Sequence, residues 1–329
     1  PPRQPPTRRT AGRGPGFGLG ATMTDDAAHP ATGPAPLISV LLPVHNGGAF
    51  LAEALDSVLS QTLGDLEVIA VENGSTDGSL SVLRDRATHD DRLRVIDAGP
   101  VGLVAALNLA IGTARGRYLA RMDADDIADP RRFDHQVHYL RTHRDIAVIG
   151  TAHDYIDSSG VTVGSRRFAT GPDLVAASFY FGNPIAHPTV MIDRRRTGEL
   201  TYPSEWPDAE DLALWLAISR SGAKVDNLGE LLMHYRVHQD SVTAQPDAAV
   251  GSSDIDAVVA ASRWPPRPCR WAVTRTFNVK GRRISIGSFL LGVIALNALN
   301  LVHREVKVWA LLSRSTLAIA AGLPRPSRR

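Results

Sequence analysis

Residues 116–126 read GRYLARMDADD, a short apolar strand pattern that runs directly into three carboxylates. In open α/β sheets, ligands bind beyond the carboxyl ends of the strands, which is where these acids would lie. Three carboxylates within four positions repel one another unless a cation balances them, and a divalent metal that prefers oxygen ligands is a natural partner. A solvated acidic turn before the next helix is the alternative interpretation.

Strand and helix patterns alternate on both sides of residues 116–126. Short apolar runs, typical of buried strands, cover residues 37–42, 66–71, 93–96, 146–150, 188–192 and 231–238. Helices are expected over residues 50–59, from about 80, and over 103–113, 130–143, 172–181 and 210–221. Pro43 is expected to end the first strand, Asp129 to cap a helix that begins at Pro130, and Tyr155 to lie in a hairpin with residues 161–168. This alternation predicts an α/β fold with a doubly wound, mostly parallel sheet, followed by a C-terminal helical extension.

Composition divides the chain into four parts: 1–36, 37–150, 151–243 and 244–329. Residues 1–36 are rich in Pro, Gly, Ala and Arg and are predicted to be disordered, with no apolar core of a signal peptide and with Met23 as a candidate start. The net charge of +2 conceals an asymmetry, because residues 263–329 carry 13 basic residues and one acid, whereas 37–262 carry a net charge of −12. An acidic body argues against nucleic acid as a partner. The lone Cys269 fits a reducing compartment, so we expect a cytoplasmic protein.

The basic tail contains 19 uncharged residues, 284–302, which is the lower limit for a membrane span. Two asparagines and two glycines weaken that interpretation. A helix packed on the body, or one lying at the inner face of the plasma membrane with its arginines on lipid phosphates, is the alternative.

Two polar loops, 72–79 and 123–126, follow strands that should end at one edge of the sheet, so we expect them to share a crevice. Amides and carboxylates in the first loop suit a base and a ribose, and the acids of the second suit a metal that carries a diphosphate. No G-x-G-x-x-G follows the first strand and no Walker A loop is present, which argues against a dinucleotide or P-loop site.

An ordered set of motifs over residues 37–243 resembles the family 2 glycosyltransferases of the GT-A fold. The set comprises SVLLPVHN (39–46), LDSVLSQT (55–62), ENGSTDGS (72–79), DADD (123–126), PRRF (130–133), HPTVM (187–191), AEDLALW (209–215) and YRVH (235–238). The resemblance implies that residues 37–150 bind a nucleotide sugar and that 151–243 supply the acceptor and catalytic side. It also implies inverting transfer of a sugar from a nucleotide-diphosphate donor, with UDP-sugars favoured, to a glycan or lipid-linked acceptor in cell-envelope polysaccharide or glycolipid synthesis.

The same resemblance assigns roles to individual residues. Asp211 would be the general base, and Asp125 with His238 would hold Mg²⁺ or Mn²⁺. Asp123 would contact the ribose or sugar, and Asp126 would be the most dispensable acid of the three. The donor-binding set would be Pro43, His45, Asn46, Glu72, Asn73, Asp77, Asp123, Ala124, Arg236 and His238. Asn73 stands where the family often has a second acid, which leaves the choice of base open.

Each of these roles has a structural alternative. Asp211 would also suit the first turn of a helix because of the helix dipole. His238 would also suit a loop end, Arg236 a salt bridge, His187 a structural role beside Pro188, and Trp215 the core. The alternative functions are a sugar-phosphate nucleotidyltransferase, which usually has a basic residue after the first strand, and an inactive nucleotide-sugar-binding scaffold.

Overall fold

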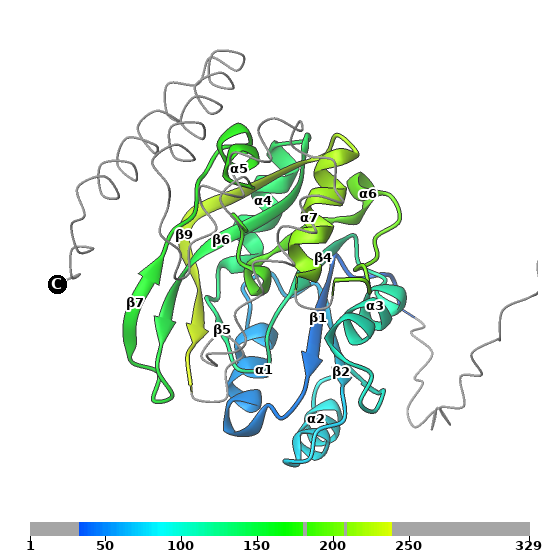
Figure 1. Cartoon of the computed structure of the whole chain (residues 1–329). Helices are drawn as coiled ribbons and strands as arrows, with labels where there is room; N and C mark the ends of the chain where they lie inside the picture. Colours follow the sequence, from blue (N-terminus) through cyan, green and yellow to red (C-terminus); the bar gives the residue numbers. More distant parts are fainter. Residues whose placement is uncertain (1–32, 180–182, 207–208, 239–329) are drawn as a thin grey trace, which may run out of the picture. The chain divides into compact units, whose positions relative to one another are not determined.

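A nine-stranded mixed sheet forms the centre of the described part of the chain, residues 33–179, 183–206 and 209–238 of this computed structural model (Figure 1). The strand order is β3-β2-β1-β4-β8-β6-β9-β5, with β7 attached to β6. The strands are β1 (Ile38–Val44), β2 (Leu66–Glu72), β3 (Leu93–Asp97), β4 (Tyr118–Arg121), β5 (Ile127–Ala128), β6 (Ile146–Ile156), β7 (Thr162–Arg166), β8 (Met191–Asp193) and β9 (Lys224–Arg236).

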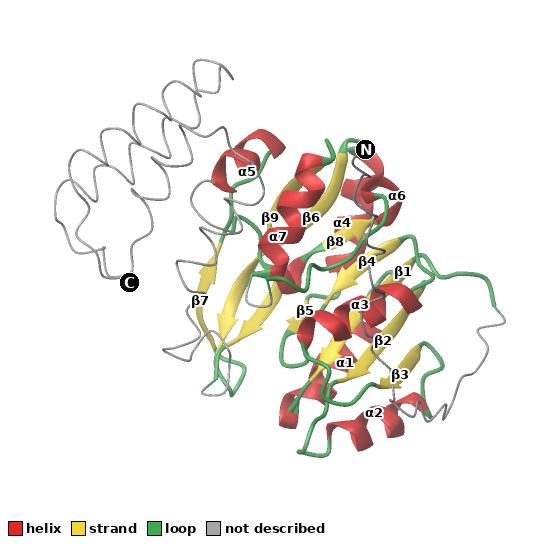
Figure 2. Ribbon diagram, turned by 45° about the vertical axis from the view of Figure 1, so that its right-hand side comes forward, coloured by secondary structure: helices red, strands yellow, loops and turns green. Residues whose placement is uncertain are grey.

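Four parallel strands, β3-β2-β1-β4, form the first part of the sheet. Every residue of β1 and β2 is buried, because helices cover both faces of the sheet. Side chains on β1 alternate between two cores: Leu41 packs with α3 and α7, and Leu42 packs with α1 and α4. The helices are α1 (Leu51–Leu59), α2 (Ser79–Ala87), α3 (Leu103–Thr113), α4 (Arg132–Thr142), α5 (Pro172–Ser178), α6 (Arg194–Thr197) and α7 (Glu210–Arg220) (Figure 2). The predicted α/β fold is confirmed, and Trp215, fully buried on α7, lies in the core as expected.

The second part of the sheet is mixed. The short β8 lies antiparallel between β4 and β6, whereas β6 and β9 run parallel to each other. β7 completes the predicted hairpin with β6. Because β6 runs through residue 150, the predicted division between two halves falls inside a strand and both halves share one sheet.

Several sequence-based boundaries are wrong: the strand predicted over 231–238 is Lys224–Arg236, and three further differences have identifiable reasons. β1 continues past Pro43 to Val44. On the β4 side the pairing ends at Leu41, so the N–H that Pro43 lacks costs β1 no hydrogen bond to that strand. α4 begins at Arg132 rather than Pro130, because the Pro130 carbonyl accepts hydrogen bonds from the N–H and hydroxyl of Thr62.

The third boundary concerns residues 188–192. They contain a 3₁₀ turn, η3 (His187–Thr189), so the strand is confined to Met191–Asp193. None of the helices in the described residues is both long and apolar enough to cross a bilayer. Of the segment predicted to be disordered, 1–36, residues 1–32 lie outside the described residues. Cys269, the tail and the segment 284–302 also lie outside them.

Candidate active site

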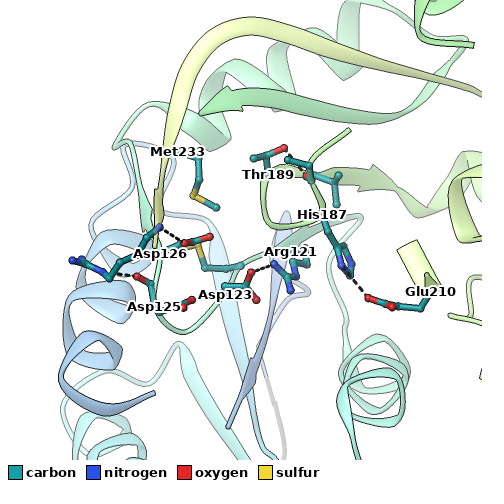
Figure 3. Close-up of polar contacts among 12 residues, drawn as sticks. Arg121, Asp123, Asp125, Asp126, His187, Thr189, Glu210 and Met233 are labelled. Carbon is teal, nitrogen blue, oxygen red and sulfur yellow. Dashed lines mark hydrogen bonds and ion pairs between the residues drawn. The ribbon is translucent and has the colours of Figure 1, made fainter. Parts of the chain in front are cut away.

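The acid loop, residues 122–126, links β4 to β5 at the carboxyl-terminal edge of the parallel strands. The Met122 N–H donates to the Leu41 carbonyl, so the loop leaves the sheet beside the end of β1. Asp123, Asp125 and Asp126 each offer a carboxylate oxygen within 4.8 Å of the others (Figure 3). The three acids therefore converge as predicted instead of separating into solvent.

Asp126 is the most buried of these acids, with an exposure of 1%. Its Oδ1 accepts a 2.9 Å hydrogen bond from the Arg236 N–H, whereas Oδ2 has no partner among the described residues. Burial, followed by the neighbouring charges of Asp123 and Asp125, raises the pKa of Asp126 well above its usual range. We expected Asp126 to matter least of the three, and this environment argues otherwise.

Two buried arginines partly balance the acids. Arg121 forms an ion pair with Asp123, and burial raises the pKa of Asp123 against the opposing effect of that pair. Arg132 is fully buried behind the loop and donates to the Arg121 carbonyl at 2.8 Å, and burial lowers its pKa to about 9. The sulfur atoms of Met122 and Met233 lie 3.6 Å and 3.7 Å from its Nη1.

Pairing of β5 with β9 brings the end of β9 to the acid loop, because Ile127 lies opposite His234. His238 Nε2 then lies 3.1 Å from Asp125 Oδ2, so the two predicted metal ligands are adjacent. The Arg236 guanidinium is also close, but it is only 2% exposed and its Nε donates to the Asp125 carbonyl at 2.8 Å.

These groups fit a divalent cation. Three carboxylates and an imidazole are oxygen and nitrogen donors suited to Mg²⁺ or Mn²⁺. The partnerless Asp126 oxygen and the raised pKa values of Asp123 and Asp126 show a local excess of negative charge that a cation would neutralise.

The polar loop after β2 is held in shape by its own acids and amides. Glu72 accepts hydrogen bonds from the N–H groups of Gly74 and Ser75. Asp77 accepts from the Gly48 N–H at 2.7 Å and from the Ser79 N–H at 3.0 Å. These two predicted donor-binding acids therefore build the loop.

His45 and Asn46 join the loop after β1 to the loop after β2. Asn46 has a positive φ of 52° and accepts a 2.8 Å hydrogen bond from the Thr76 N–H. His45 Nδ1 donates to the Asn73 carbonyl at 2.9 Å. The Asn73 side-chain oxygen in turn accepts a 2.8 Å hydrogen bond from the Gly102 N–H, so the side-chain nitrogen points away from Gly102.

Pro43 and Ala124 are buried beside these loops, and neither offers a polar side-chain group to a ligand. Gly102, Phe50 just before α1 and Glu53 in α1 make contacts that the sequence did not indicate. Only their positions in space connect them to the site.

The start of α7 lies on the other side of Arg121 from the acid loop, together with His187 from the 3₁₀ turn (Figure 3). His187 Nε2 lies 2.8 Å from the Tyr202 hydroxyl and its Nδ1 lies 3.5 Å from Glu210 Oε1. Burial and the nearby Arg121 lower the pKa of His187 to about 3, so this side chain is neutral. Its buried contacts agree with the expected structural role.

Asp211, the second residue of α7, accepts hydrogen bonds from Asn183 Nδ2 at 2.5 Å and from the Leu212 N–H at 2.6 Å. Burial is the main cause that raises the pKa of its carboxyl group. A carboxylate with a raised pKa is a better proton acceptor near neutral pH than an ordinary aspartate. Asn183 lies in none of the sequence motifs, so its contact with Asp211 could not be predicted from the sequence.

Comparison with known proteins agrees with this geometry. The glycosyl transferase family 2 model matches residues 39–199. The putative glycosyltransferase EpsE of Bacillus subtilis is 35% identical over 211 residues, which cover 63% of this chain and 74% of that protein. The Escherichia coli enzyme UDP-Glc:alpha-D-GlcNAc-diphosphoundecaprenol beta-1,3-glucosyltransferase WfaP is 30% identical over 209 residues, which cover 63% of this chain and 80% of that protein.

The fold likewise matches a solved glycosyltransferase. The mannosyltransferase PcManGT of Pyrobaculum calidifontis, in complex with GDP-Man and Mn²⁺, superposes with a TM-score of 0.55 at 18% identity, covering 87% of this chain and 81% of that chain. At this identity the likeness concerns the fold, and it agrees with the GT-A architecture expected from the sequence. From the matched family model and these relatives, the chain is a glycosyltransferase and belongs to glycosyltransferase family 2.

Proposed function

We propose that this enzyme transfers a sugar from a nucleotide-diphosphate donor to an acceptor hydroxyl in a metal-dependent, inverting reaction. The observation that carries the proposal is the meeting of three carboxylates within 4.8 Å, with His238 3.1 Å from Asp125, at the carboxyl ends of parallel strands. The loops after β1 and β2 contain Asn46 and Asn73, whose amides suit a base and a ribose.

Asp125 and His238 would hold Mg²⁺ or Mn²⁺, with Asp126 beneath them, and Asp123 would contact the ribose or the sugar. The PcManGT structure contains Mn²⁺, which supports a divalent cation in this fold. Pro43, His45, Asn73 and Ala124 would contact the nucleotide, and Asn46, Glu72 and Asp77 would hold the loops around it. A bound cation neutralises the charge that builds up on the departing diphosphate.

Asp211 would act as the general base. The acceptor hydroxyl attacks the anomeric carbon from the side opposite the diphosphate and gives its proton to the Asp211 carboxylate. The new C–O bond forms as the bond to the diphosphate breaks, and the electron pair leaves with the nucleoside diphosphate. Attack from the opposite side inverts the anomeric configuration.

The acceptor would be a glycan or a lipid-linked saccharide used in a cell-envelope polysaccharide. The name of the WfaP relative gives UDP-Glc as its donor and a diphosphoundecaprenol-linked sugar as its acceptor, which supports this class and a uridine donor. The 13 basic residues of 263–329 would bring the enzyme to the anionic inner face of the plasma membrane.

A donor panel tests the proposal. The full-length protein is incubated with UDP-, GDP- and other nucleotide sugars, Mn²⁺ and polyprenyl-diphosphate saccharides, and nucleoside diphosphate release is followed with and without EDTA. We expect one preferred donor, loss of turnover in EDTA and an inverted product by NMR. The variant Asp125→Asn should be inactive, whereas Asp56→Asn, on the surface of α1, should keep full activity. Turnover that is unaffected by EDTA, or a product with retained configuration, would refute the mechanism.

A further inference from the structure

Arg236, at the end of β9, has its guanidinium buried within the protein. Nε donates to the Asp125 carbonyl at 2.8 Å, Nη1 to the Asp157 carbonyl at 3.1 Å, and Nη2 to Glu53 Oε2 at 2.6 Å. The residue is 2% exposed. Each guanidinium nitrogen therefore donates to a protein oxygen, and the burial of the side chain keeps its remaining N–H groups away from the surface.

These contacts join segments that are far apart in the sequence. Asp125 belongs to the acid loop, Asp157 follows β6, and Glu53 lies in the first turn of α1. The guanidinium carbon also lies 4.4 Å from the centre of the Phe50 ring, just before α1. One side chain thus fixes the acid loop relative to both the sheet and a helix.

The same residue holds two neighbouring acids by different groups. Its backbone N–H donates to Asp126 Oδ1 at 2.9 Å, while its side chain holds the Asp125 carbonyl. Two positions later, His238 Nε2 lies 3.1 Å from Asp125 Oδ2, and its ring centre lies 5.1 Å from that of Phe50. Phe50 therefore contacts both Arg236 and His238.

An ion pair alone does not account for this arrangement. The Glu53 side chain is 56% exposed, and ion pairs with an exposed partner contribute little to stability. Two of the three hydrogen bonds instead go to backbone carbonyls of the segments that carry the site. A planar fork can serve three oxygens in different directions, whereas the single ammonium of lysine cannot reproduce that geometry.

We infer that Arg236 is a positioning residue, which sets the acid loop and His238 so that Asp125 and His238 can bind one divalent cation. This inference rests on the proposed metal dependence. It assigns Arg236 a role through the loop, in place of the donor contact that the family resemblance implies. Groups that support metal ligands in this way typically change metal affinity about 10–100-fold when they are replaced.

The test measures Mn²⁺ affinity of the full-length protein, without donor, by electron paramagnetic resonance of free Mn²⁺. We expect Arg236→Lys to weaken binding at least about tenfold. Arg196→Lys is the matched control, because Arg196 on α6 also bonds an acid, Asp193, and three backbone carbonyls, but it contacts none of the acid loop. The variant Arg196→Lys should lower the melting temperature and leave Mn²⁺ affinity unchanged.

A milder pair of variants keeps the test decisive if Arg236→Lys fails to fold. Glu53→Gln removes only the charge of the α1 partner and should weaken Mn²⁺ binding less, in the same direction. Asp56→Asn, on the same helix and paired with Arg86, is its control and should have no effect. Wild-type Mn²⁺ affinity in folded Arg236→Lys, or a rise only in its donor KM, would overturn the positioning role. If Arg236→Lys does not fold, wild-type Mn²⁺ affinity in Glu53→Gln would overturn it. Absence of Mn²⁺ binding by the wild-type protein would overturn the proposed metal dependence together with it.

Discussion

Replacing Asp211 with asparagine should separate catalysis from binding in this enzyme. In the structure, Asp211 Oδ1 accepts from the Leu212 N–H at 2.6 Å, and an amide oxygen can keep that bond. The second contact, from Asn183 at 2.5 Å, would place two amide groups together, and losing it costs about 1 kcal/mol. Removing a general base lowers the rate by about 10²–10⁴-fold, which is roughly 3–5 kcal/mol of transition-state stabilisation. The catalytic loss therefore exceeds the structural one by a wide margin.

The assay compares kcat for nucleoside diphosphate release with donor and Mn²⁺ affinities measured by calorimetry. We expect Asp211→Asn to lose at least about a hundredfold in kcat and to keep both affinities within a few-fold. Glu210→Gln is the adjacent control. Glu210 lies 3.5 Å from His187 and is buried, so its replacement should lower the free energy of unfolding and reduce kcat less than Asp211→Asn does. An equal collapse of donor affinity in Asp211→Asn, or a larger kcat loss in Glu210→Gln, would refute the assignment of the base.

Three further predictions concern neighbouring features. The pKa of His187 is lowered to about 3 from its ordinary 6.5, so neutral His187 contributes stability above pH 6.5 that is lost as the pH falls. Between pH 7.5 and 5, urea unfolding should show that the wild-type protein loses about 2 kcal/mol more of its free energy of unfolding than His187→Gln does. Equal losses would contradict this prediction. Asn73→Asp removes the amide donors while the Gly102 contact remains, so affinity for the preferred nucleoside diphosphate should fall about 5–30-fold by calorimetry; an unchanged affinity would remove Asn73 from the base site. The full-length chain should sediment with anionic vesicles at low salt and be released by 0.5 M NaCl, because the Debye length shrinks from about 30 Å at 0.01 M to well below 10 Å. Binding that salt does not change would exclude the basic tail as the attachment.

The first half of the fold follows closely from the sequence because its signals are local. Buried parallel strands such as β1 have continuous apolar runs, and the acids of the acid loop directly follow one of them. The second half is harder because β8 is three residues long and its antiparallel place between β4 and β6 is a long-range choice that no local pattern encodes. The acid loop can therefore be predicted from the sequence, whereas the position of β8 in the sheet cannot.

The roles of individual site residues show the same limit. Arg236 at the end of a strand is compatible with a phosphate contact or with a salt bridge, and only the β5–β9 register decides where its guanidinium lies. Asp126 looked redundant beside Asp125, since the sequence carries no sign that one would be buried and the other partly exposed. Asn73 could be proposed for the base, but its hydrogen bond with Gly102, 29 residues away, could not.

The pairing of β5 with β9 also has a consequence for synthesis of the protein. The acid loop emerges from the ribosome more than a hundred residues before Arg236, the residue that bonds both Asp125 and Asp126. During that interval the growing chain holds the acids without the strand that orders them, and contacts of such large sequence separation form slowly. The nascent chain therefore orders the acid loop only after β9 has been translated and paired, so a fragment that ends at residue 150 would carry every carboxylate of the loop without the Arg236 contacts that hold it.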